Sequence, residues 1–407
     1  MTRVPDWIAS IEDLRKRAHA RVPKPFMDYM EAGSFAQLTL RDNRRDLDSI
    51  RFRERVMFDV SNRKLDTTML GEKVSIPVAI GPTGMCGAIW SNGEILSCRA
   101  AHAFGVPFSL STNALLSIED VRSSVDRPFW FQLYLEKDRG FSQELIERAK
   151  KAGCPVLILT MDLHVEGTRY CDKHNGLGVP PKLTPANIWS IVSHPPWAFG
   201  MLHSKRWSFG NYADKMKSGN VKEMAQLVKS QLDSSFDVKT LEWVRSLWPG
   251  KLVVKGILEV EDAKMAVKAG ADAILVSNHG GRQLDGAPST ASVVTSIVDA
   301  VGDKVEVYVD SGVRSGLDVL KFLGLGARAC FIGRAYLYGL GAYQQAGVTK
   351  VLEILKDELS IAMALTGVTD VTKVPRDIIL RGPPDPTKPS AATSGGPYRD
   401  IRVYEES

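Results

Sequence analysis

The sequence predicts an α/β protein folded as a TIM (β/α)8 barrel, and two repeated patterns carry this prediction. The first is a set of eight short apolar runs of the buried-strand type, most of them followed by a segment with helical spacing of apolar residues. The second is a glycine, in the position of a left-handed cap, after four of those helical segments. The runs lie at 78–81, 108–111, 129–134, 156–162, 252–257, 273–277, 305–310 and 329–333. The glycines are Gly105, Gly153, Gly270 and Gly326, after helical segments at 92–104, 142–152, 261–269 and 316–325.

The repeating unit is a strand followed by a helix, and eight such units favour a parallel sheet that closes on itself. An open sheet of this size would need a reversal of strand order that nothing in the sequence marks. In a closed barrel the chemistry lies at the carboxyl ends of the strands, although Ser111 and Thr160 fit a strand-capping role equally well. The polar candidates at those ends are Thr83, Ser111, Gln132, Tyr134, Thr160, Asp162, Lys255, His279, Asp310 and Arg314.

Length and composition limit the classes of function. With 407 residues, 44% hydrophobic and 24% charged, the chain suits one barrel with additional segments. A net charge of +5 without a dense Lys/Arg cluster argues against nucleic acid and leaves anionic substrates or an anionic membrane surface. The five cysteines are scattered and odd in number, which fits reduced thiols and no metal site. Near the N-terminus there is neither a secretory signal nor an apolar span, so we expect a cytoplasmic protein.

The stretch at 277–286, SNHGGRQLDG, carries the strongest chemical signal. It follows an apolar strand, and its two central glycines permit a sharp turn that brings His279 and Arg282 to one pocket. A base beside a guanidinium favours a carboxylate substrate. The alternative is a Gly-rich loop with a solvated arginine and a histidine that only caps it.

Two further features predict an anionic group at the same end of the barrel. Lys255 interrupts the apolar strand 252–257, where a buried charge is costly unless it meets an anion or polar ligand. The loops after the last two strands, 310–316 and Gly333-Arg334, combine glycine amides with arginines and suit a phosphate dianion. A nicotinamide cofactor is disfavoured because no G-x-G-x-x-G opens a helix after an early strand.

These residues together resemble the FMN-dependent 2-hydroxy acid dehydrogenase and oxidase family, the group of glycolate oxidase, mandelate dehydrogenase, quinone-linked L-lactate dehydrogenase and the flavocytochromes. The likeness runs from about residue 11 to residue 380, with the 277–286 stretch as the family signature. The supporting motifs occur in the family's order: Asp28-Tyr29, Pro82-Thr83-Gly84, Phe131-Gln132-Leu133-Tyr134, Thr160-Met161-Asp162, Arg169, Val254-Lys255-Gly256, Asp310-Ser311-Gly312-Val313-Arg314 and Gly333-Arg334.

The resemblance implies a role for each matched residue. His279 would take a proton from the substrate, with Asp162 holding the imidazole, while electrons pass to flavin N5 either as hydride or through a carbanion. Arg282 and Arg169 would bind the substrate carboxylate, and Tyr29 and Tyr134 would hydrogen-bond its carboxylate and hydroxyl groups. Lys255 would lie near flavin N1 and O2. The implied FMN-binding set is Pro82, Thr83, Gly84, Ser111, Gln132, Thr160, Lys255, Ser277, Asp310, Gly312, Arg314, Gly333 and Arg334.

Three departures from the family pattern bear on the substrate. Asn113 stands where glycolate-type oxidases carry tryptophan, so we expect a more open and more polar pocket wall. His164 and Glu166 precede Arg169 where apolar or proline residues are usual, and they either touch substrate or are solvated loop residues. Gly84 matches the dehydrogenases better than the oxidases, which usually carry alanine there.

Segments outside the strand and helix repeat complete the predicted organisation. A barrel domain at 1–380 would carry a long insertion after the fourth strand, at about 172–245, and an extended or disordered tail at 381–407. Within the insertion, tryptophans alternate with basic residues at 185–210, which suits a membrane interface, although packing on the barrel or on another subunit would explain them equally well. We expect residues 8–28 to be helical, to close the base of the barrel and to deliver Tyr29 to the pocket.

We therefore expect an FMN-dependent enzyme that oxidises an L-2-hydroxy acid, lactate- or mandelate-like, to the 2-oxo acid. Electrons would pass on to quinone, with the protein peripheral on the cytoplasmic face of the inner membrane, and family members of this type imply a homotetramer. One alternative is an oxidase that uses oxygen and releases peroxide. A second is a flavin- or phosphate-binding barrel without catalysis.

Overall fold

The computed structural model describes residues 3–176, 184–215 and 233–382, and eight parallel strands form its centre. In the sheet their order is β4-β11-β10-β9-β8-β7-β6-β5, and a bridge between Ile80 and Phe108 joins the first and last strands into a barrel. The strands are β4 (Val78–Ile80), β5 (Ser109–Ser111), β6 (Trp130–Leu133), β7 (Val156–Thr160), β8 (Lys251–Ile257), β9 (Ala273–Val276), β10 (Glu306–Val309) and β11 (Ala329–Ile332). All eight predicted runs are strands, so the TIM-barrel prediction is confirmed.

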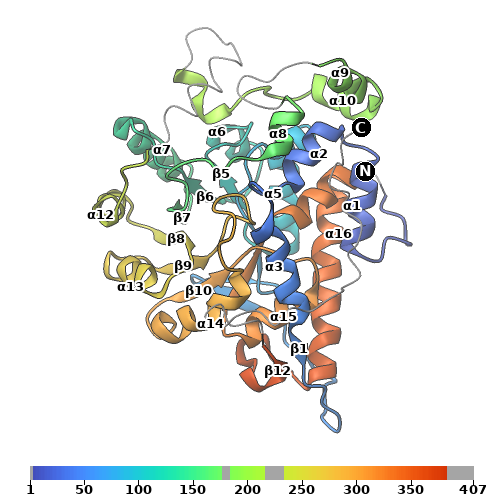
Figure 1. Ribbon diagram of the computed structural model, residues 1–407, viewed down its shortest axis with the longest axis vertical. Helices are drawn as coiled ribbons and strands as arrows, with labels where there is room; N and C mark the ends of the chain where they lie inside the picture. The colour runs from blue at the N-terminus through green and yellow to red at the C-terminus, as the bar shows by residue number, and fades with distance from the viewer. Residues whose placement is uncertain (1–2, 177–183, 216–232, 383–407) are drawn as a thin grey trace.

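Each strand is followed by a helix that covers the outside of the barrel, with α4 (Cys86–Ile89) before this helix after β4 and the insertion before it after β7 (Figure 1). These helices are α5 (Gly93–Phe104), α6 (Ile118–Arg122), α7 (Arg139–Lys151), α12 (Val238–Leu247), α13 (Val260–Lys268), α14 (Thr290–Val301), α15 (Gly316–Gly324) and α16 (Arg334–Thr366). The predicted glycine caps Gly105, Gly153, Gly270 and Gly326 all have a left-handed backbone, with φ between +74° and +100°. Glycine adopts this conformation at little cost, so each helix ends and the next strand begins where the sequence indicated.

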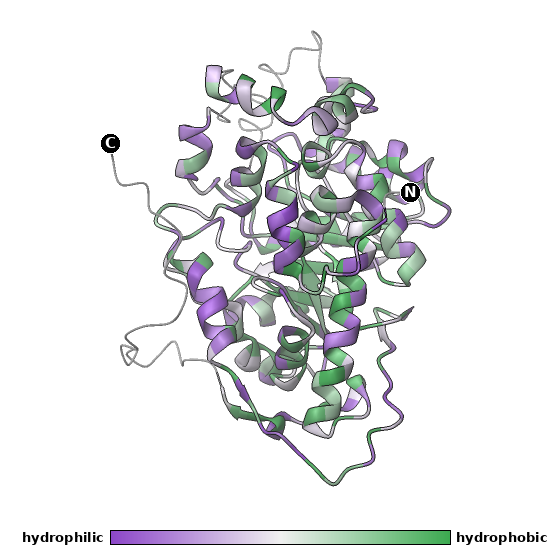
Figure 2. Cartoon of the chain, turned by 90° about the vertical axis from the view of Figure 1, so that its right-hand side faces the viewer, coloured by the Kyte–Doolittle hydropathy of each residue, from purple (hydrophilic) through white to green (hydrophobic). Residues whose placement is uncertain are grey.

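Residues along each barrel strand alternate between two environments, because successive side chains of a strand point to opposite faces. The outward-facing residues join the main core under the helices, as Leu157 and Val254 do. The inward-facing apolar residues, such as Ile158 and Tyr308, form a separate core inside the barrel. Figure 2 shows apolar residues concentrated in these central strands. The next inward positions toward the carboxyl ends are polar: Ser111, Gln132, Thr160, Lys255, Ser277 and Asp310.

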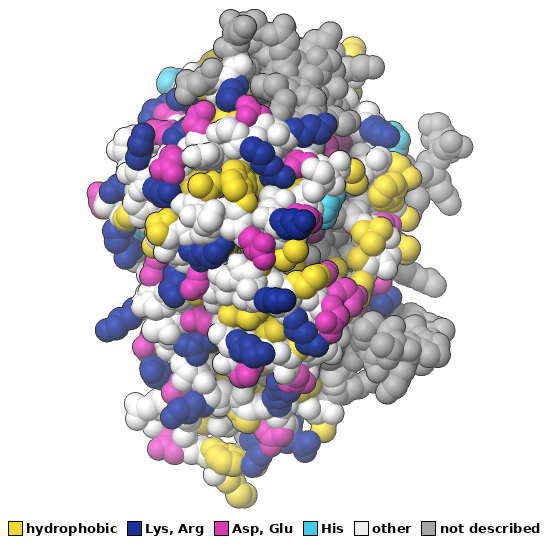
Figure 3. Space-filling view, turned by 90° about the vertical axis from the view of Figure 1, so that its left-hand side faces the viewer, with side chains coloured by type: hydrophobic (Ala, Val, Ile, Leu, Met, Phe, Trp, Pro, Cys, Tyr) yellow, Lys and Arg dark blue, Asp and Glu magenta, His cyan; other side chains and the backbone are white. Residues whose placement is uncertain are grey.

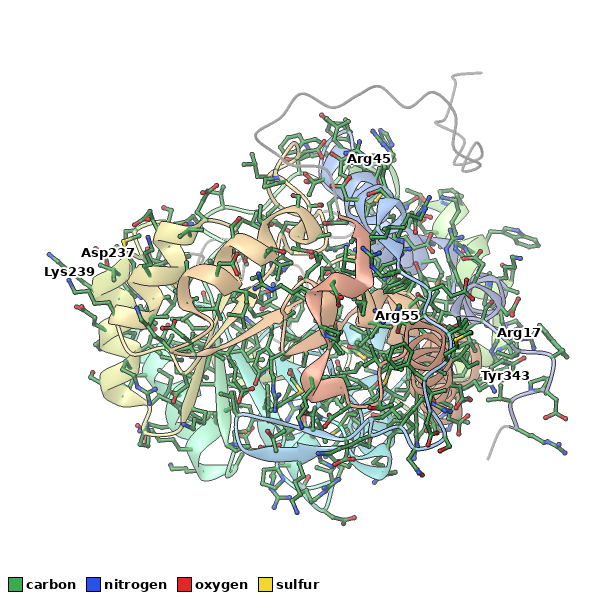
Figure 4. The ribbon with its side chains drawn as sticks, turned by 90° about the horizontal axis from the view of Figure 1, so that it is seen from below. Arg17, Arg45, Arg55, Asp237, Lys239 and Tyr343 are labelled. Carbon is green, nitrogen blue, oxygen red and sulfur yellow. The ribbon has the colours of Figure 1, made fainter. Side chains whose placement is uncertain are left out.

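The base of the barrel is closed by a hairpin and not, as predicted, by the N-terminal region. The hairpin pairs β2 (Thr67–Met69) with β3 (Glu72–Val74), and Met69 and Val74 pack into the inner core. The N-terminal region is helical as expected, forming α1 (Ile11–His19) and α2 (Lys24–Glu31). However, α1 packs against α16 on the side of the barrel, where Arg17 lies over the Tyr343 ring (Figure 4), and α2 packs beside the insertion. Base closure needs apolar residues that point into the inner core, and the hairpin supplies them.

The long insertion lies between β7 and α12, as predicted, and sits with α2 at one end of the molecule (Figure 1). Its described elements are α8 (Tyr170–His174), α9 (Pro185–Val192), α10 (Pro195–Leu202) and η1 (Gly210–Lys215). Trp197 packs inward, donating from Nε1 to the Ala88 carbonyl at 3.1 Å, whereas Trp189 and Trp207 are 71% and 57% exposed. Packing on the barrel therefore accounts for Trp197. It does not account for Trp189 and Trp207, whose side chains are exposed.

The remaining elements lie around the barrel. They are α3 (Leu38–Ser49), α4 (Cys86–Ile89), η2 (Val371–Lys373), η3 (Arg376–Ile378) and a pair formed by β1 (Arg51–Phe52) with β12 (Ile379–Arg381). β12 includes Arg381, the first residue of the predicted tail, and residues 383–407 lie outside the described part of the chain. On the face that carries α7, α12 and α13, acidic and basic side chains are interspersed (Figure 3).

Candidate active site

The loop after β9 carries His279, and the backbone conformation of this loop decides where the imidazole lies. His279 has a left-handed backbone with a φ of +57°, and its N–H donates to the Ser277 hydroxyl at 3.0 Å. Gly280 and Gly281 follow with φ values of +67° and +73°. A Cβ on Gly281 would lie 2.6 Å from the backbone nitrogen of Leu40, so only glycine fits where α3 passes the loop. A histidine held in this uncommon conformation is typical of a functional site.

His279 lies between a carboxylate and a phenol. Its Nδ1 is 3.0 Å from Asp162 Oδ1, and its Nε2 is 3.3 Å from the Tyr134 hydroxyl. Burial, together with the charge of Lys255, lowers the pKa of His279 below its ordinary value of 6.5, and burial raises the pKa of Tyr134. Burial by itself would raise the pKa of Asp162, but His279 and Lys255 hold it at about 2. The ionised carboxylate therefore accepts the Nδ1 proton of a neutral imidazole, whose Nε2 keeps the lone pair of a base.

The two arginines predicted to bind a carboxylate flank one aromatic ring. The guanidinium carbons of Arg282 and Arg169 lie 4.9 Å and 5.5 Å from the centre of the Tyr29 ring. Arg282 Nη1 donates to the carbonyls of Tyr29 and Ala32 at 2.7 Å and 2.9 Å. Burial and the charge of Arg169 lower the pKa of Arg282, while Asp172 acts to raise it; no carboxylate within residues 3–176, 184–215 and 233–382 lies at salt-bridge distance from Arg282. Two cations this close, one of them without a counter-ion, favour an anionic ligand.

Arg169 differs from Arg282 because it already has two carboxylate partners. Its Nε is 2.6 Å from Asp172 and its Nη2 is 2.7 Å from Glu166. Burial acts against these charges, but Tyr29 and the two carboxylates raise the pKa of Arg169. Glu166 is thus an exposed partner of Arg169. His164 is also exposed, and its ring stacks on that of Phe236 with 4.0 Å between the ring centres.

The inward polar residues lie on neighbouring strands at the same end of the barrel as His279, and three of them are linked by hydrogen bonds. The Ser111 hydroxyl donates to Gln132 Oε1 at 2.8 Å, and Gln132 Nε2 donates to the Thr160 hydroxyl at 3.0 Å. Lys255 has a side chain that is 4% exposed, and its Nζ lies 3.9 Å from Asp310 Oδ2. This Nζ has no hydrogen-bond partner in the described part of the chain. A buried cation without a hydrogen bond is costly, so Lys255 fits a ligand that presents acceptor atoms, such as the carbonyl and nitrogen atoms of a flavin ring.

The predicted phosphate loops meet at the start of α16. Ser311 and Gly312 have left-handed backbones, with φ values of +74° and +104°, and Gly333 caps α16 without any side-chain hydrogen bond. Burial, followed by repulsion from other arginines, lowers the pKa of Arg334 to about 9. Concentrated positive charge at an uncapped helix start fits a phosphate group.

Arg334 is, however, largely committed to protein carbonyls. Its Nε, Nη1 and Nη2 donate to the carbonyls of Met30, Gly280 and Ala32 at 2.9 Å, 2.9 Å and 3.0 Å. Arg334 thereby joins the end of α2 to the His279 loop. Among the residues that the structure describes, Arg314 donates to a single carbonyl, that of its neighbour Val313 at 2.8 Å, and so has more donors left for a phosphate.

The turn after β4 supplies the remaining predicted residues. Pro82, Thr83 and Gly84 are partly buried, and the Thr83 hydroxyl hydrogen-bonds the Tyr336 hydroxyl. A Cβ built on Gly84 would lie 3.9 Å from the Tyr29 hydroxyl, which places this turn beside the arginine cluster. The structure thus brings all the predicted residues to the carboxyl end of the barrel.

Sequence reasoning missed two buried residues beside this site, Tyr212 and Glu136. The Tyr212 hydroxyl lies 2.5 Å from Glu136 and 3.1 Å from Asn113, although 76 and 99 residues separate these partners in the chain. No local pattern in the sequence indicates a contact between residues that lie so far apart in the chain.

Comparison with known proteins gives a consistent result over nearly the whole chain. The model of the FMN-dependent dehydrogenase family matches residues 18–381. A structure of (S)-mandelate dehydrogenase, described as a monotopic membrane protein, is 38% identical with a TM-score of 0.88, covering 92% of this chain and 99% of its own. A soluble mutant of the membrane-associated enzyme from Pseudomonas putida is 39% identical with a TM-score of 0.77, covering 91% and 99%. Mandelate oxidase is 32% identical with a TM-score of 0.77, covering 90% and 97%.

Proposed function

Because this chain belongs to the FMN-dependent dehydrogenase family, we propose that it oxidises an L-2-hydroxy acid to the 2-oxo acid with His279 as the base. The observation that carries the proposal is the neutral imidazole held between Asp162 and Tyr134, next to two arginines around Tyr29. FMN, when bound, supplies the acceptor for the two electrons of the oxidation.

Each residue of the site would have its own role in this reaction. Arg282, with Arg169, binds the substrate carboxylate, and Tyr134 hydrogen-bonds its hydroxyl group. His279 Nε2 takes a proton from the substrate, and the imidazolium that forms is stabilised by Asp162 at 3.0 Å. General-base catalysis of this kind contributes about 10²- to 10⁴-fold to the rate, and positioning by the arginines adds to it.

The substrate and the electron acceptor are inferred from the comparisons and from Gly84. Similarity to mandelate-oxidising enzymes favours an aryl 2-hydroxy acid, and lactate is the second choice. Gly84 matches the dehydrogenases, which supports quinone as the acceptor, whereas similarity to mandelate oxidase supports oxygen as the alternative. A flavin-binding barrel without catalysis is disfavoured, because such a protein has no need of a positioned base.

The His279→Gln variant tests the base. We expect flavin to remain bound and its anaerobic reduction by mandelate or lactate to slow by at least about 10²-fold. The matched control is His102→Gln on α5, where the side chain contacts Cys98 outside the site. Near-normal reduction in the His279 variant would refute the base assignment. Absence of bleaching of the native enzyme by any 2-hydroxy acid would instead support the binder, and peroxide release in air would identify an oxidase.

We also propose that α9 and α10 contact a membrane surface. Trp189, Val192, Phe199 and Leu202 are each at least 60% exposed, and they are followed by Lys205, which is partly exposed and pairs with Asp120 at 3.1 Å. Among the described residues no helix has the length and apolarity that crossing a bilayer requires.

The double variant Trp189→Ser, Phe199→Ser should no longer sediment with anionic vesicles. Phe58→Ser, at an exposed site elsewhere, should still sediment with them. Equal sedimentation of both variants would contradict the proposal. The cytoplasmic location and the homotetramer stay predictions.

A further inference from the structure

A polar cluster that the proposed mechanism does not use adjoins the active site. Tyr212, from η1 of the insertion, is 1% exposed, and its hydroxyl lies 2.5 Å from Glu136 Oε1 and 3.1 Å from Asn113 Oδ1. The insertion is anchored at this point, because Asn211 Nδ2 donates to the Thr112 carbonyl at 3.0 Å. The tyrosine is therefore held in place by the fold around it.

Asn113 lies beside the residues proposed to bind substrate. A Cβ built on Gly84 would be 3.5 Å from Asn113 Cβ and 3.9 Å from the Tyr29 hydroxyl. Burial, then Glu136 and more weakly Tyr134, raises the pKa of Tyr212, so the two phenols lie close enough to interact electrostatically. Asn113 therefore borders the region where the substrate carboxylate and hydroxyl would be held, and it is only partly buried.

One phenol proton cannot serve both neighbours of Tyr212, so the proton on Glu136 decides how the Asn113 amide is turned. If Glu136 is protonated, it donates to the phenol oxygen, and the phenol donates to Asn113 Oδ1. If Glu136 is ionised, the phenol donates to the carboxylate, and the amide must turn so that Nδ2 donates to the phenol oxygen. The end of the Asn113 amide that Tyr212 does not engage would then meet a substrate as an NH₂ donor in the first state and as an oxygen acceptor in the second.

The surroundings of Glu136 favour the protonated state. Its side chain is fully buried, and its Oε2 has no hydrogen-bond partner within the described ranges of the chain. Its backbone N–H donates to Ser142 of α7 at 3.1 Å. The hydrogen bond from Tyr212 acts to lower the pKa of Glu136, and the charge of Asp138, which pairs with Lys215 at 3.0 Å, acts to raise it. An ionised carboxylate with an orphaned oxygen is costlier in such a place than a neutral acid. Burial raises the pKa of Glu136 to about 7.

We propose that Asn113, whose amide group is oriented by Tyr212 and Glu136, selects 2-hydroxy acids whose side chain carries a hydrogen-bond acceptor. The inference rests on the proposed function, since the side chain in question is that of a 2-hydroxy acid. Glu136 is neutral below its folded pKa and loses its proton above it. Selection for an acceptor should therefore be present at acidic pH and be lost as the pH rises through about 7.

Isosteric substrate pairs test this selection in the holoenzyme. One pair is 4-methoxymandelate and 4-ethylmandelate, and the other is 2-hydroxy-3-methoxypropanoate and 2-hydroxypentanoate, so each ether faces a hydrocarbon of the same shape. The measurement is the ratio of kcat/KM for anaerobic flavin reduction within a pair, which cancels the titration of His279. At about pH 6 we expect the ether to be preferred by about tenfold in at least one pair, and at about pH 8 the preference should vanish.

Three variants separate this role from a structural one. In Glu136→Gln, the amide donates to Tyr212 at every pH, so the preference for the ether should no longer depend on pH. In Asn113→Leu, the preference should be absent at both pH values. Glu144→Gln, on the exposed face of α7, is the matched control and should behave as the native enzyme does. Flavin content checks that each variant is folded.

Several results would overturn the proposal. They are equal use of ether and hydrocarbon by the native enzyme at about pH 6, retention of the pH dependence in Glu136→Gln, and reduction by lactate with no reduction by any larger acid. The first measurement needs no variant. Reduction of the flavin without discrimination refutes this inference alone, whereas failure of every 2-hydroxy acid to reduce it refutes the proposed function as well.

Discussion

Replacing Asp162 with asparagine tests the proposed base, His279, through its partner. Asp162 holds Nδ1 of His279 at 3.0 Å and 3.1 Å from its two oxygens, and the substitution removes the charge while keeping the shape. Burial acts to raise the pKa of Asp162, but His279 first and then Lys255 hold it at about 2, a net fall equivalent to roughly 2 kcal/mol. Loss of a stabilisation of that order from the imidazolium formed during proton transfer would slow the reaction by roughly 30-fold.

A second effect adds to the loss of charge. The carboxamide that replaces the carboxylate can donate to Nδ1, which would move the imidazole proton to Nε2 and block the base. We therefore expect flavin reduction to slow by about 10²- to 10⁴-fold in Asp162→Asn. The assay is anaerobic stopped-flow reduction at saturating substrate, with flavin content and affinity for the 2-oxo acid measured in parallel. Asp272→Asn, where the carboxylate pairs with Lys251 at 2.9 Å at the opposite end of the barrel, is the matched control.

Reduction by Asp162→Asn within about threefold of the native rate would refute the reasoning, because neither the tautomer nor the cation would then depend on this carboxylate. A loss of flavin with unaltered chemistry in the fraction still loaded would point to a structural role instead.

Three further predictions follow from single contacts. Arg282→Met should weaken binding of the 2-oxo acid by about 10- to 10²-fold with the flavin retained, and unaltered affinity in a flavin absorbance titration would exclude the carboxylate contact. The rate of flavin reduction should fall only below about pH 6.5, because the lowered pKa of His279 keeps the base neutral above it, and a fall beginning well above that pH would contradict the direction of the shift. Gly347→Ala should cost about 2 kcal/mol or more of stability in denaturant unfolding, because its Cβ would lie 1.9 Å from the Gly339 carbonyl oxygen, and an unchanged unfolding midpoint would count against this close packing.

The success of the barrel prediction has a local cause. A parallel strand covered on both faces consists of a short run of apolar residues, which is visible in the sequence. Gly105 and Gly270 mark helix ends because the backbone there is left-handed. Lys255 was recognisable because a lysine in such a run violates the burial rule, and the structure leaves its amine without a hydrogen-bond partner in the described part of the chain. The prediction for the base of the barrel was wrong, because nothing in the sequence of the hairpin at 67–74 indicates that it packs into the inner core.

The sequence by itself determined the eight β-α units, the polar residues at the carboxyl ends of the strands and the flavin family, because all of these follow from periodicity and from residues close together in the chain. Tertiary structure alone decided which partners those residues have. It committed three donors of Arg334 to backbone carbonyls, gave Arg169 two carboxylate partners and brought Tyr212 of the insertion to Asn113. Such contacts join segments that folding brings together, so their geometry depends on packing over long chain separations and leaves no local pattern to be recognised.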